Sequence, residues 1–153
     1  MRLYINSMFP FLACITAIIS AQFLKPFFYY LKEKKWNMSL MHASGQFPSS
    51  HAAGVSAITL AVGLQDGFSS SLFAVTLAFS LIVVYDAANV RYYAGKNIQI
   101  TQQLIKDIQL LSKTPLDDPI YFTRVKNVLG HKWFEIIGGI IHGITISLIL
   151  YIL

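Results

Sequence analysis

Long apolar runs dominate the pattern of hydrophobic and polar positions along the chain. Three of them, residues 8–24, 71–90 and 134–152, are each near the ~20 residues that a helix needs to cross a bilayer core. A fourth run, 52–64, is shorter, because at ~1.5 Å per residue it reaches roughly 20 Å against a core of ~30 Å. This run either crosses the bilayer with the help of its flanking residues or a tilt, or inserts partway and returns to the same side. The pattern predicts an all-α integral membrane bundle of about four hydrophobic helices, the second of them short.

A polar stretch between the third and fourth runs has a helical periodicity of its own. Residues 97–112 read NIQITQQLIKDIQLLS, with Ile, Leu and Thr at helical spacing and Gln, Lys and Asp between them. They predict an amphipathic helix, which could lie on the membrane surface, continue the third run, or pack on a second copy. The prolines of TPLDDP, 114–119, end it. We expect residues 1–153 to form a single membrane domain, with 91–132 as a cytoplasmic insert.

Composition and charge support the membrane class and predict an orientation. Only 12% of the residues are charged, against about 25% in soluble domains. Eleven of the twelve Lys and Arg lie in segments 25–44 and 91–132. Since basic loop residues favour the inner side of a membrane, both segments are expected in the cytoplasm. The net charge of +5 therefore indicates cytoplasmic loops facing anionic headgroups in a plasma or organellar membrane, with no nucleic-acid partner.

Ionisable groups near a membrane are functional candidates, because burying a charge in lipid is costly. In the predicted topology these groups collect at one boundary, the cytoplasmic ends of all four runs. The candidates are Lys25, Ser49, Ser50, His51, Asp86, Arg91, Lys96, His131 and Glu135. The three cations among them would repel a metal ion but suit an anion with two negative charges, such as a phosphate monoester, so we expect no metal and no cofactor.

Two short segments give these candidates a chemistry. In FPSSHAAG a serine can cap the following helix, whose unpaired first-turn N–H groups bind anions, and His51 beside them can donate a proton. In GHKWFEIIGG, His131 and Glu135 are four residues apart, so the carboxylate can fix the tautomer of a nucleophilic imidazole. The alternatives are a capped helix with a histidine at headgroup level and an ordinary contact at a helix start. Gly139 and Gly143 form G-x-x-x-G, which favours close helix packing.

PSSH before an apolar helix, LQDGFSSSLFAVTLAFSLIVVYDAANVRYYAGK and LGHKWFEIIGGIIHG together resemble the divergent branch of the type-2 phosphatidic acid phosphatase superfamily, which also includes the vanadium haloperoxidases. The resemblance runs from about Lys25 to Gly143 and implies a metal-independent membrane phosphatase. Its substrate would be a lipid phosphate monoester or pyrophosphate, hydrolysed through a phosphohistidine at the cytoplasmic interface.

The resemblance also implies roles for single residues. His131 would attack phosphorus, Glu135 would orient it, and His51 would protonate the leaving alkoxide. Asp86 would hold Arg91 or Lys96. The implied phosphate ligands are Lys25, Ser49, Ser50, Arg91 and Lys96.

Other readings stay open at this point. Ser50 stands where the superfamily has glycine, and Glu135 where it has aspartate. A non-catalytic protein that binds or transports a lipid phosphate would use the same cationic cradle. A structural assembly factor would instead use 97–112 to recruit a partner. Four short spans bury little surface, so a homodimer is a further expectation.

Overall fold

The computed structural model describes residues 8–111, 118–122 and 130–153, and its regular elements within these ranges are all helical. In chain order they are α1 (Phe9–Glu33), η1 (Met38–His42), α2 (Ser50–Asp66), α3 (Ser71–Tyr85), the π-helical η2 (Asp86–Val90), α4 (Arg91–Leu111), η3 (Pro119–Phe122) and α5 (Trp133–Ile152). The predicted all-α architecture is confirmed.

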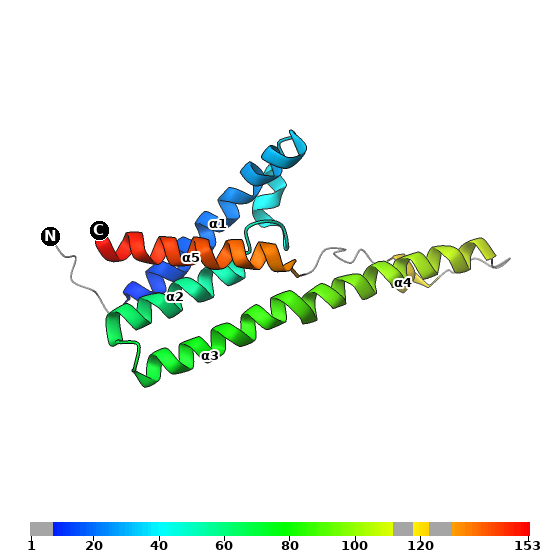
Figure 1. Ribbon diagram of the computed structural model, residues 1–153. Helices are drawn as coiled ribbons and strands as arrows, with labels where there is room; N and C mark the ends of the chain where they lie inside the picture. The colour runs from blue at the N-terminus through cyan, green and yellow to red at the C-terminus, as the bar shows by residue number, and fades with distance from the viewer. Residues whose placement is uncertain (1–7, 112–117, 123–129) are drawn as a thin grey trace.

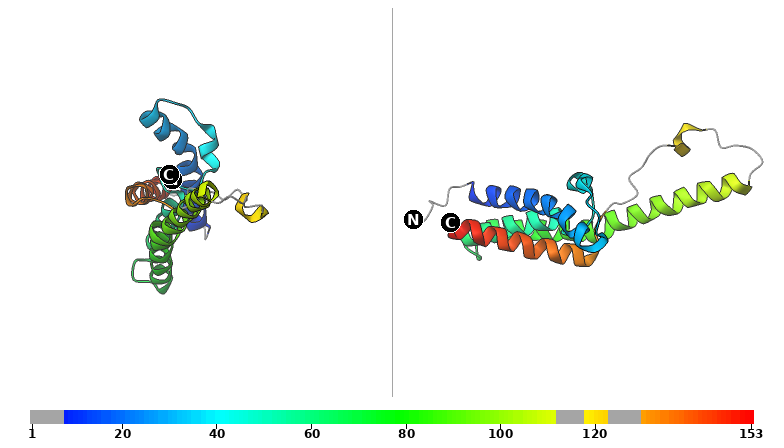
Figure 2. Two further views of the ribbon diagram at one scale, coloured as in Figure 1. Left: turned by 90° about the vertical axis from the view of Figure 1, so that its right-hand side faces the viewer. Right: turned by 90° about the horizontal axis from the view of Figure 1, so that it is seen from above.

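Within the described residues, three helices are long and apolar enough to cross a membrane: α1, the continuous helix Ser71–Leu111, and α5. The 17-residue α2 is the short second helix of the prediction. Figures 1 and 2 show that α1 and α3 run in one direction and α2 and α5 in the other. Since α2 runs between the same two ends as its neighbours, segments 25–44 and 91–111 begin at the same end of the bundle.

The helix α2 is the centre of the bundle, because α1, α3 and α5 all pack against it. Its contact with α1 is made by alanines four residues apart on both helices, each with 0% of its surface exposed. Lipid tails are as apolar as leucine, so helices in a membrane associate through close packing of small residues. The alanines of this contact are Ala13, Ala17, Ala21, Ala53, Ala57 and Ala61.

The glycines of the G-x-x-x-G motif bring α5 equally close to the start of α2. A Cβ atom added at Gly139 would lie 2.3 Å from the carbonyl oxygen of Ser49, and one at Gly143 would lie 2.1 Å from that of Ala53. These neighbours are backbone atoms, which cannot turn away as a side chain could. The predicted close approach of the last span is confirmed.

We expect Gly143→Ala to destabilise the bundle by about 2 kcal/mol, because the added methyl group must push α5 away from the Ala53 carbonyl. Thermal unfolding of the purified protein in detergent measures the loss. Gly63→Ala is the matched control, since its methyl group would meet the exposed Phe68 ring, which can move. Equal melting temperatures for the two variants would contradict the packing argument.

The long helix Ser71–Leu111 shows one of the three alternatives for the amphipathic segment, namely that it continues the third run. α4 continues α3 through η2 and extends past the bundle (Figure 1). The segment 97–112 therefore continues the third apolar run as far as Leu111. Residue 112 lies outside the described residues, and so do residues 114–117 of the stretch predicted to end the helix. Apolar side chains such as Ile100 and Leu104 are exposed along α4.

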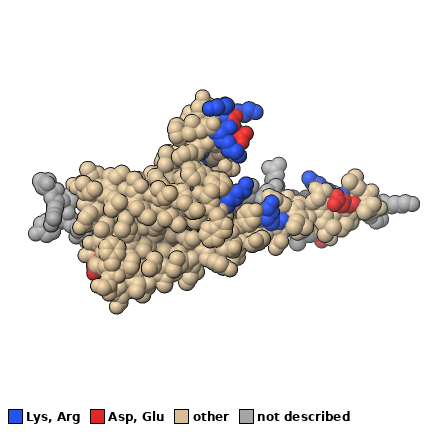
Figure 3. Space-filling model, in the orientation of Figure 1, with Lys and Arg blue, Asp and Glu red and all other residues tan. Residues whose placement is uncertain are grey.

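Basic side chains gather at one end of the molecule. Figure 3 shows Lys and Arg where α1 ends, beside the start of α4, and farther along α4, while the rest of the visible bundle surface is almost free of charge. We call the end where α1 and α3 finish and α2 and α5 begin the basic end. Large apolar side chains cover the remaining surface, as expected for a surface that contacts lipid.

Candidate active site

The start of α2 is fixed by Ser49, which caps the helix and ties it to α5. The Ser49 hydroxyl oxygen accepts from the Ala52 N–H at 3.3 Å, and its own N–H donates to the carbonyl oxygen of Glu135 at 2.9 Å. Ser49 and Ser50 are both buried, whereas His51 in the first turn is exposed. The sequence PSSH thus folds into a capped helix start that holds His51 over the beginning of α5.

The segment before α5 docks on the π turn of the long helix. The His131 N–H donates to the carbonyl oxygen of Ala87 at 3.0 Å. Gly130 has φ = +79°, and a Cβ atom on it would lie 2.3 Å from the backbone nitrogen of Tyr92. A π turn inserts one residue into an α-helix and is common at functional sites. Only glycine combines this left-handed conformation with so close an approach, so Gly130 lets His131 reach the π turn.

The ring of His131 is bonded to Glu135 through Nδ1 and lies beside the ring of His51. Its Nδ1 lies 3.0 Å from Oε2 of Glu135, which also accepts the Lys132 N–H at 3.2 Å. With Nδ1–H donated to the carboxylate, Nε2 carries the free lone pair. His131 is 3% exposed, so its surroundings hold the ring in place. This is the geometry of an oriented nucleophile or base.

Two histidines that are far apart in the sequence meet at the basic end. The ring centroids of His51 and His131 are 6.0 Å apart, at an interplanar angle of 66°. The charges of Lys25, Asp86 and Arg91 are close enough to act on the His51 ring. The structure therefore brings together residues from α1, α2, η2, α4 and the segment just before α5.

The two cations beside the histidines have different partners. Arg91 donates through Nε to Oδ2 of Asp86, so the Asp86 carboxylate holds Arg91 and not Lys96. Lys25 is 1% exposed, and its ammonium donates to the carbonyl oxygen of Ala43 at 2.9 Å. A buried lysine bonded in this way supplies positive charge beside the histidines while its own position is fixed.

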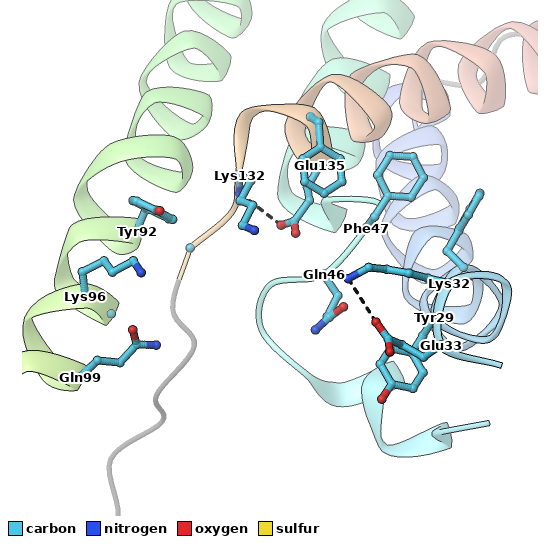
Figure 4. Close-up of a pocket in the computed structure, with 14 residues that line it drawn as sticks. Tyr29, Lys32, Glu33, Gln46, Phe47, Tyr92, Lys96, Gln99, Lys132 and Glu135 are labelled. Atoms are coloured by element: carbon cyan, nitrogen blue, oxygen red, sulfur yellow. Dashed lines mark hydrogen bonds and ion pairs between the residues drawn. The ribbon is translucent and has the colours of Figure 1, made fainter. Parts of the chain in front are cut away.

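Lys96 lies apart from this group, in a pocket of about 480 Å³ at the basic end. Figure 4 shows Lys96 and Gln99 on α4, Lys132 and Glu135 at the start of α5, and Gln46 on the connection before α2. Of the predicted site residues, Lys96 and Glu135 line this pocket, and the other predicted site residues do not.

Several site residues were not predicted from the sequence. Gly130 was missed, although a glycine directly before a candidate nucleophile is a signal of close backbone approach. The Ala87 carbonyl, Lys132 and Gln46 carry no such signal, because their position depends on how segments far apart in the chain meet. His142 is not part of this site. Its Nε2 lies 2.8 Å from the Ser20 hydroxyl oxygen, a contact that links α5 to α1 far from the histidine pair.

With this geometry established, comparison with known proteins gives the family. Residues 6–146 match the model of the divergent PAP2 family. The chain belongs to this family. A membrane protein of Bacillus subtilis strain 168, named uncharacterized membrane protein YuiD, is 35% identical over 147 residues that cover 93% of each chain. No solved structure matches the chain. The resemblance inferred from PSSH, YDA and GHKWFE is confirmed.

Proposed function

We propose that this member of the divergent PAP2 family is a membrane phosphatase that hydrolyses a lipid phosphate monoester or pyrophosphate through a phosphohistidine. The observation that carries the proposal is the pair of imidazole rings 6.0 Å apart, with Glu135 bonded to one of them. Membership in a PAP2-related family and apolar membrane helices support a membrane phosphatase in general terms.

In the proposed reaction, Nε2 of His131 attacks phosphorus in line with the ester oxygen, and the P–N bond forms as the P–O bond breaks. His51 gives its proton to the leaving alkoxide. In the second step a water molecule attacks phosphorus while His51 takes its proton. The new P–O bond forms as the P–N bond breaks, which releases inorganic phosphate and free His131. Arg91, Lys25 and the first-turn N–H groups of α2 would stabilise the charge on the phosphoryl oxygens in both steps.

An apolar groove of about 330 Å³ supports a lipid as the substrate. α2 forms its floor, and α3 and α5 form its walls. Its hydroxyl groups are bonded inward: Thr59 Oγ1 donates to the Val55 carbonyl oxygen at 2.7 Å and lies 2.6 Å from Ser80 Oγ. The groove therefore presents a hydrocarbon surface, which suits a hydrocarbon chain.

The position and length of this groove also fit a lipid tail. Val55 lies one helical turn after His51, so the groove begins just below the histidine pair. Along α3 it extends from Val84 to Phe73, about 16 Å at 1.5 Å per residue. That is roughly half of the ~30 Å bilayer core, the depth of one leaflet. A lipid with its phosphate at the histidines would lay its chain in this groove.

The proposal includes an orientation. The excess of Lys and Arg at the basic end supports a cytoplasmic location for that end, and the substrate would then come from the inner leaflet. α4 would then stand in the cytoplasm as part of the 91–132 insert of one membrane domain. Its exposed apolar residues, such as Ile100 and Leu104, would suit a homodimer.

A second candidate function is binding or transport of a lipid phosphate without hydrolysis. It is favoured by one observation: the Lys25 ammonium is bonded to the Ala43 carbonyl and is almost fully buried. A lysine satisfied in this way has to leave its partner before it can bind a phosphoryl oxygen directly.

Turnover by the purified protein in detergent tests the proposal. We expect release of inorganic phosphate from phosphatidic acid or a prenyl diphosphate, and an acid-labile, alkali-stable label on the protein when the terminal phosphate is radioactive. A water-soluble alkyl phosphate without a long tail should react more slowly, because nothing fills the groove. Tight binding of the lipid phosphate without release or labelling would replace the phosphatase by the binding protein.

A further inference from the structure

One apolar face runs along almost the whole of the long helix Ser71–Leu111. On each side of the π turn its members recur every three, four or seven residues, the spacing that puts side chains on one face of a helix. From Val75 to Leu111 this face extends about 54 Å at ~1.5 Å per residue, far beyond a bilayer core of ~30 Å. We call it the long apolar face. Its exposed apolar residues are Val75, Phe79, Ile82, Val90, Tyr93, Ile100, Leu104, Ile108 and Leu111.

The π turn keeps the two halves of the long apolar face in line. Two turns of an α-helix take about 7 residues, and a π turn inserts one more. Ile82 lies before the π turn and Val90 at its end, eight residues later, so both side chains lie on the same side of the helix. The lipid-facing stripe of α3 therefore continues in the same direction along α4, which extends past the bundle (Figure 1).

The polar side chains of α4 lie beside this face and not on it. Tyr92, Lys96 and Gln99 line the pocket at the basic end, and their own spacing of three or four residues marks a different face of the helix. The Gln103 amide donates to Oδ1 of Asp107 at 2.8 Å, which keeps that carboxylate on the Gln103 side. Contacts made through the long apolar face would therefore leave the pocket uncovered.

The exposed apolar groups outside the bundle favour burial against another surface. Ile100 and Leu104 are 65% and 56% exposed on the part of the helix that extends past the bundle. Lipid can cover only the α3 half of the face, and a water-soluble partner only the α4 half. A partner that covers both halves needs an apolar membrane helix that continues in a straight line as an amphipathic helix. The helix Ser71–Leu111 itself has this form.

We infer that two copies of this chain pair in parallel along the long apolar face, from α3 in the membrane to α4 outside it. The inference rests on the proposed homodimer and gives it an interface, and it is independent of the proposed reaction. Copies inserted in one orientation present the face at the same depth, so Ile100 and Leu104 each meet their counterparts in the other copy. Asn97, between Tyr93 and Ile100, is the polar member of the face. Its amide bonds that of its counterpart, as a core asparagine does in parallel coiled coils, where it fixes the register.

Single cysteines in native membranes test this pairing. Cys14 is the only cysteine of the chain, so Cys14→Ala gives a background without thiols. On mild oxidation we expect Ile100→Cys and Leu104→Cys to form about fivefold more disulfide-linked dimer than two control variants, because a disulfide needs Cα atoms within ~7 Å. The controls are Lys106→Cys and Gln109→Cys, at exposed positions on the opposite side of α4. Similar yields at all four positions, or no dimer at any of them, would overturn the inference.

A charge placed on the face gives an independent measurement. Leu104→Arg should weaken the dimer about tenfold or more, since two like charges would meet across the interface. Gln109→Arg is the matched control and should leave the dimer unchanged. Because Leu104 is exposed in the single chain, the bundle should keep its melting temperature. Sedimentation of the purified proteins in detergent measures the dimer, and a Leu104→Arg dimer as tight as the wild type would contradict the pairing.

Turnover measured on the same variants keeps this inference apart from the phosphatase proposal. Disulfide-linked dimers through positions 100 and 104 in a protein without turnover support the parallel pair and count against the phosphatase. Turnover in a protein that forms no such dimers supports the phosphatase and overturns the parallel pair.

Discussion

Replacing His131 with alanine should lower turnover of a lipid phosphate by about 10⁴-fold or more and remove the phosphoenzyme completely. In the proposed reaction the His131 ring forms the covalent bond to phosphorus, so without it the phosphohistidine cannot form. Its Nδ1 lies 3.0 Å from Oε2 of Glu135 and its side chain is 2% exposed, so the ring is held in one orientation. Single-turnover labelling with a radioactive terminal phosphate, together with phosphate release, measures both losses.

His51→Ala is the variant that separates nucleophile from acid. We expect a loss of about 10²- to 10⁴-fold with a lipid alkoxide as leaving group, because the proton must then come from water. With an aryl phosphate, whose leaving group needs no proton, formation of the phosphoenzyme should be largely restored, whereas its hydrolysis, in which His51 takes the proton from water, should stay slow. His131→Ala should stay inactive on both substrates. Restored activity of His131→Ala on the aryl phosphate would contradict its role as nucleophile and exchange the two assignments.

The sequence predicts the helices well because lipid imposes a simple length rule on each of them. Runs such as 8–24 and 134–152 predict membrane helices; α5 follows its run closely, whereas α1 begins with its run and continues past it to Glu33. The contact between His131 and Glu135, four residues apart, was equally predictable and is present in the structure, although His131 lies just before the start of α5. The G-x-x-x-G pair likewise gives the face of α5 that packs on α2.

Contacts between segments that are far apart in the sequence could not be predicted by such rules. The π turn is the main reason. One inserted residue rotates everything after it by about 100° relative to an unbroken α-helix. Lys96, expected among the phosphate ligands, lines the pocket that also contains Lys132 and Glu135. Asp86 and Arg91, five residues apart, meet across the same turn, although residues five apart do not share a face of an α-helix.

We expect Gly130→Ala to lower turnover by about 10²-fold, because it displaces the nucleophile without removing any reacting group. The new methyl group would lie 2.3 Å from the Tyr92 nitrogen, where ordinary contacts begin at 3.4 Å. The segment must therefore move by about 1 Å, which weakens the bond from the His131 N–H to the Ala87 carbonyl, and misplacement on this scale costs about 10²-fold in rate. Turnover and phosphoenzyme formation measure the effect.

Gly67→Ala shows how much of that loss comes from backbone strain alone. Gly67 also has a left-handed backbone, with φ = +88°, but a Cβ atom there would have no described atom within 4 Å. Both variants carry the ~1–3 kcal/mol strain of a non-glycine residue in this region, so both should melt at lower temperature. Only Gly130→Ala should lose activity at a temperature where both are folded. Because Gly67 lies at the opposite end of the bundle, equal activity losses in the two variants would mean that docking on the π turn does not position His131.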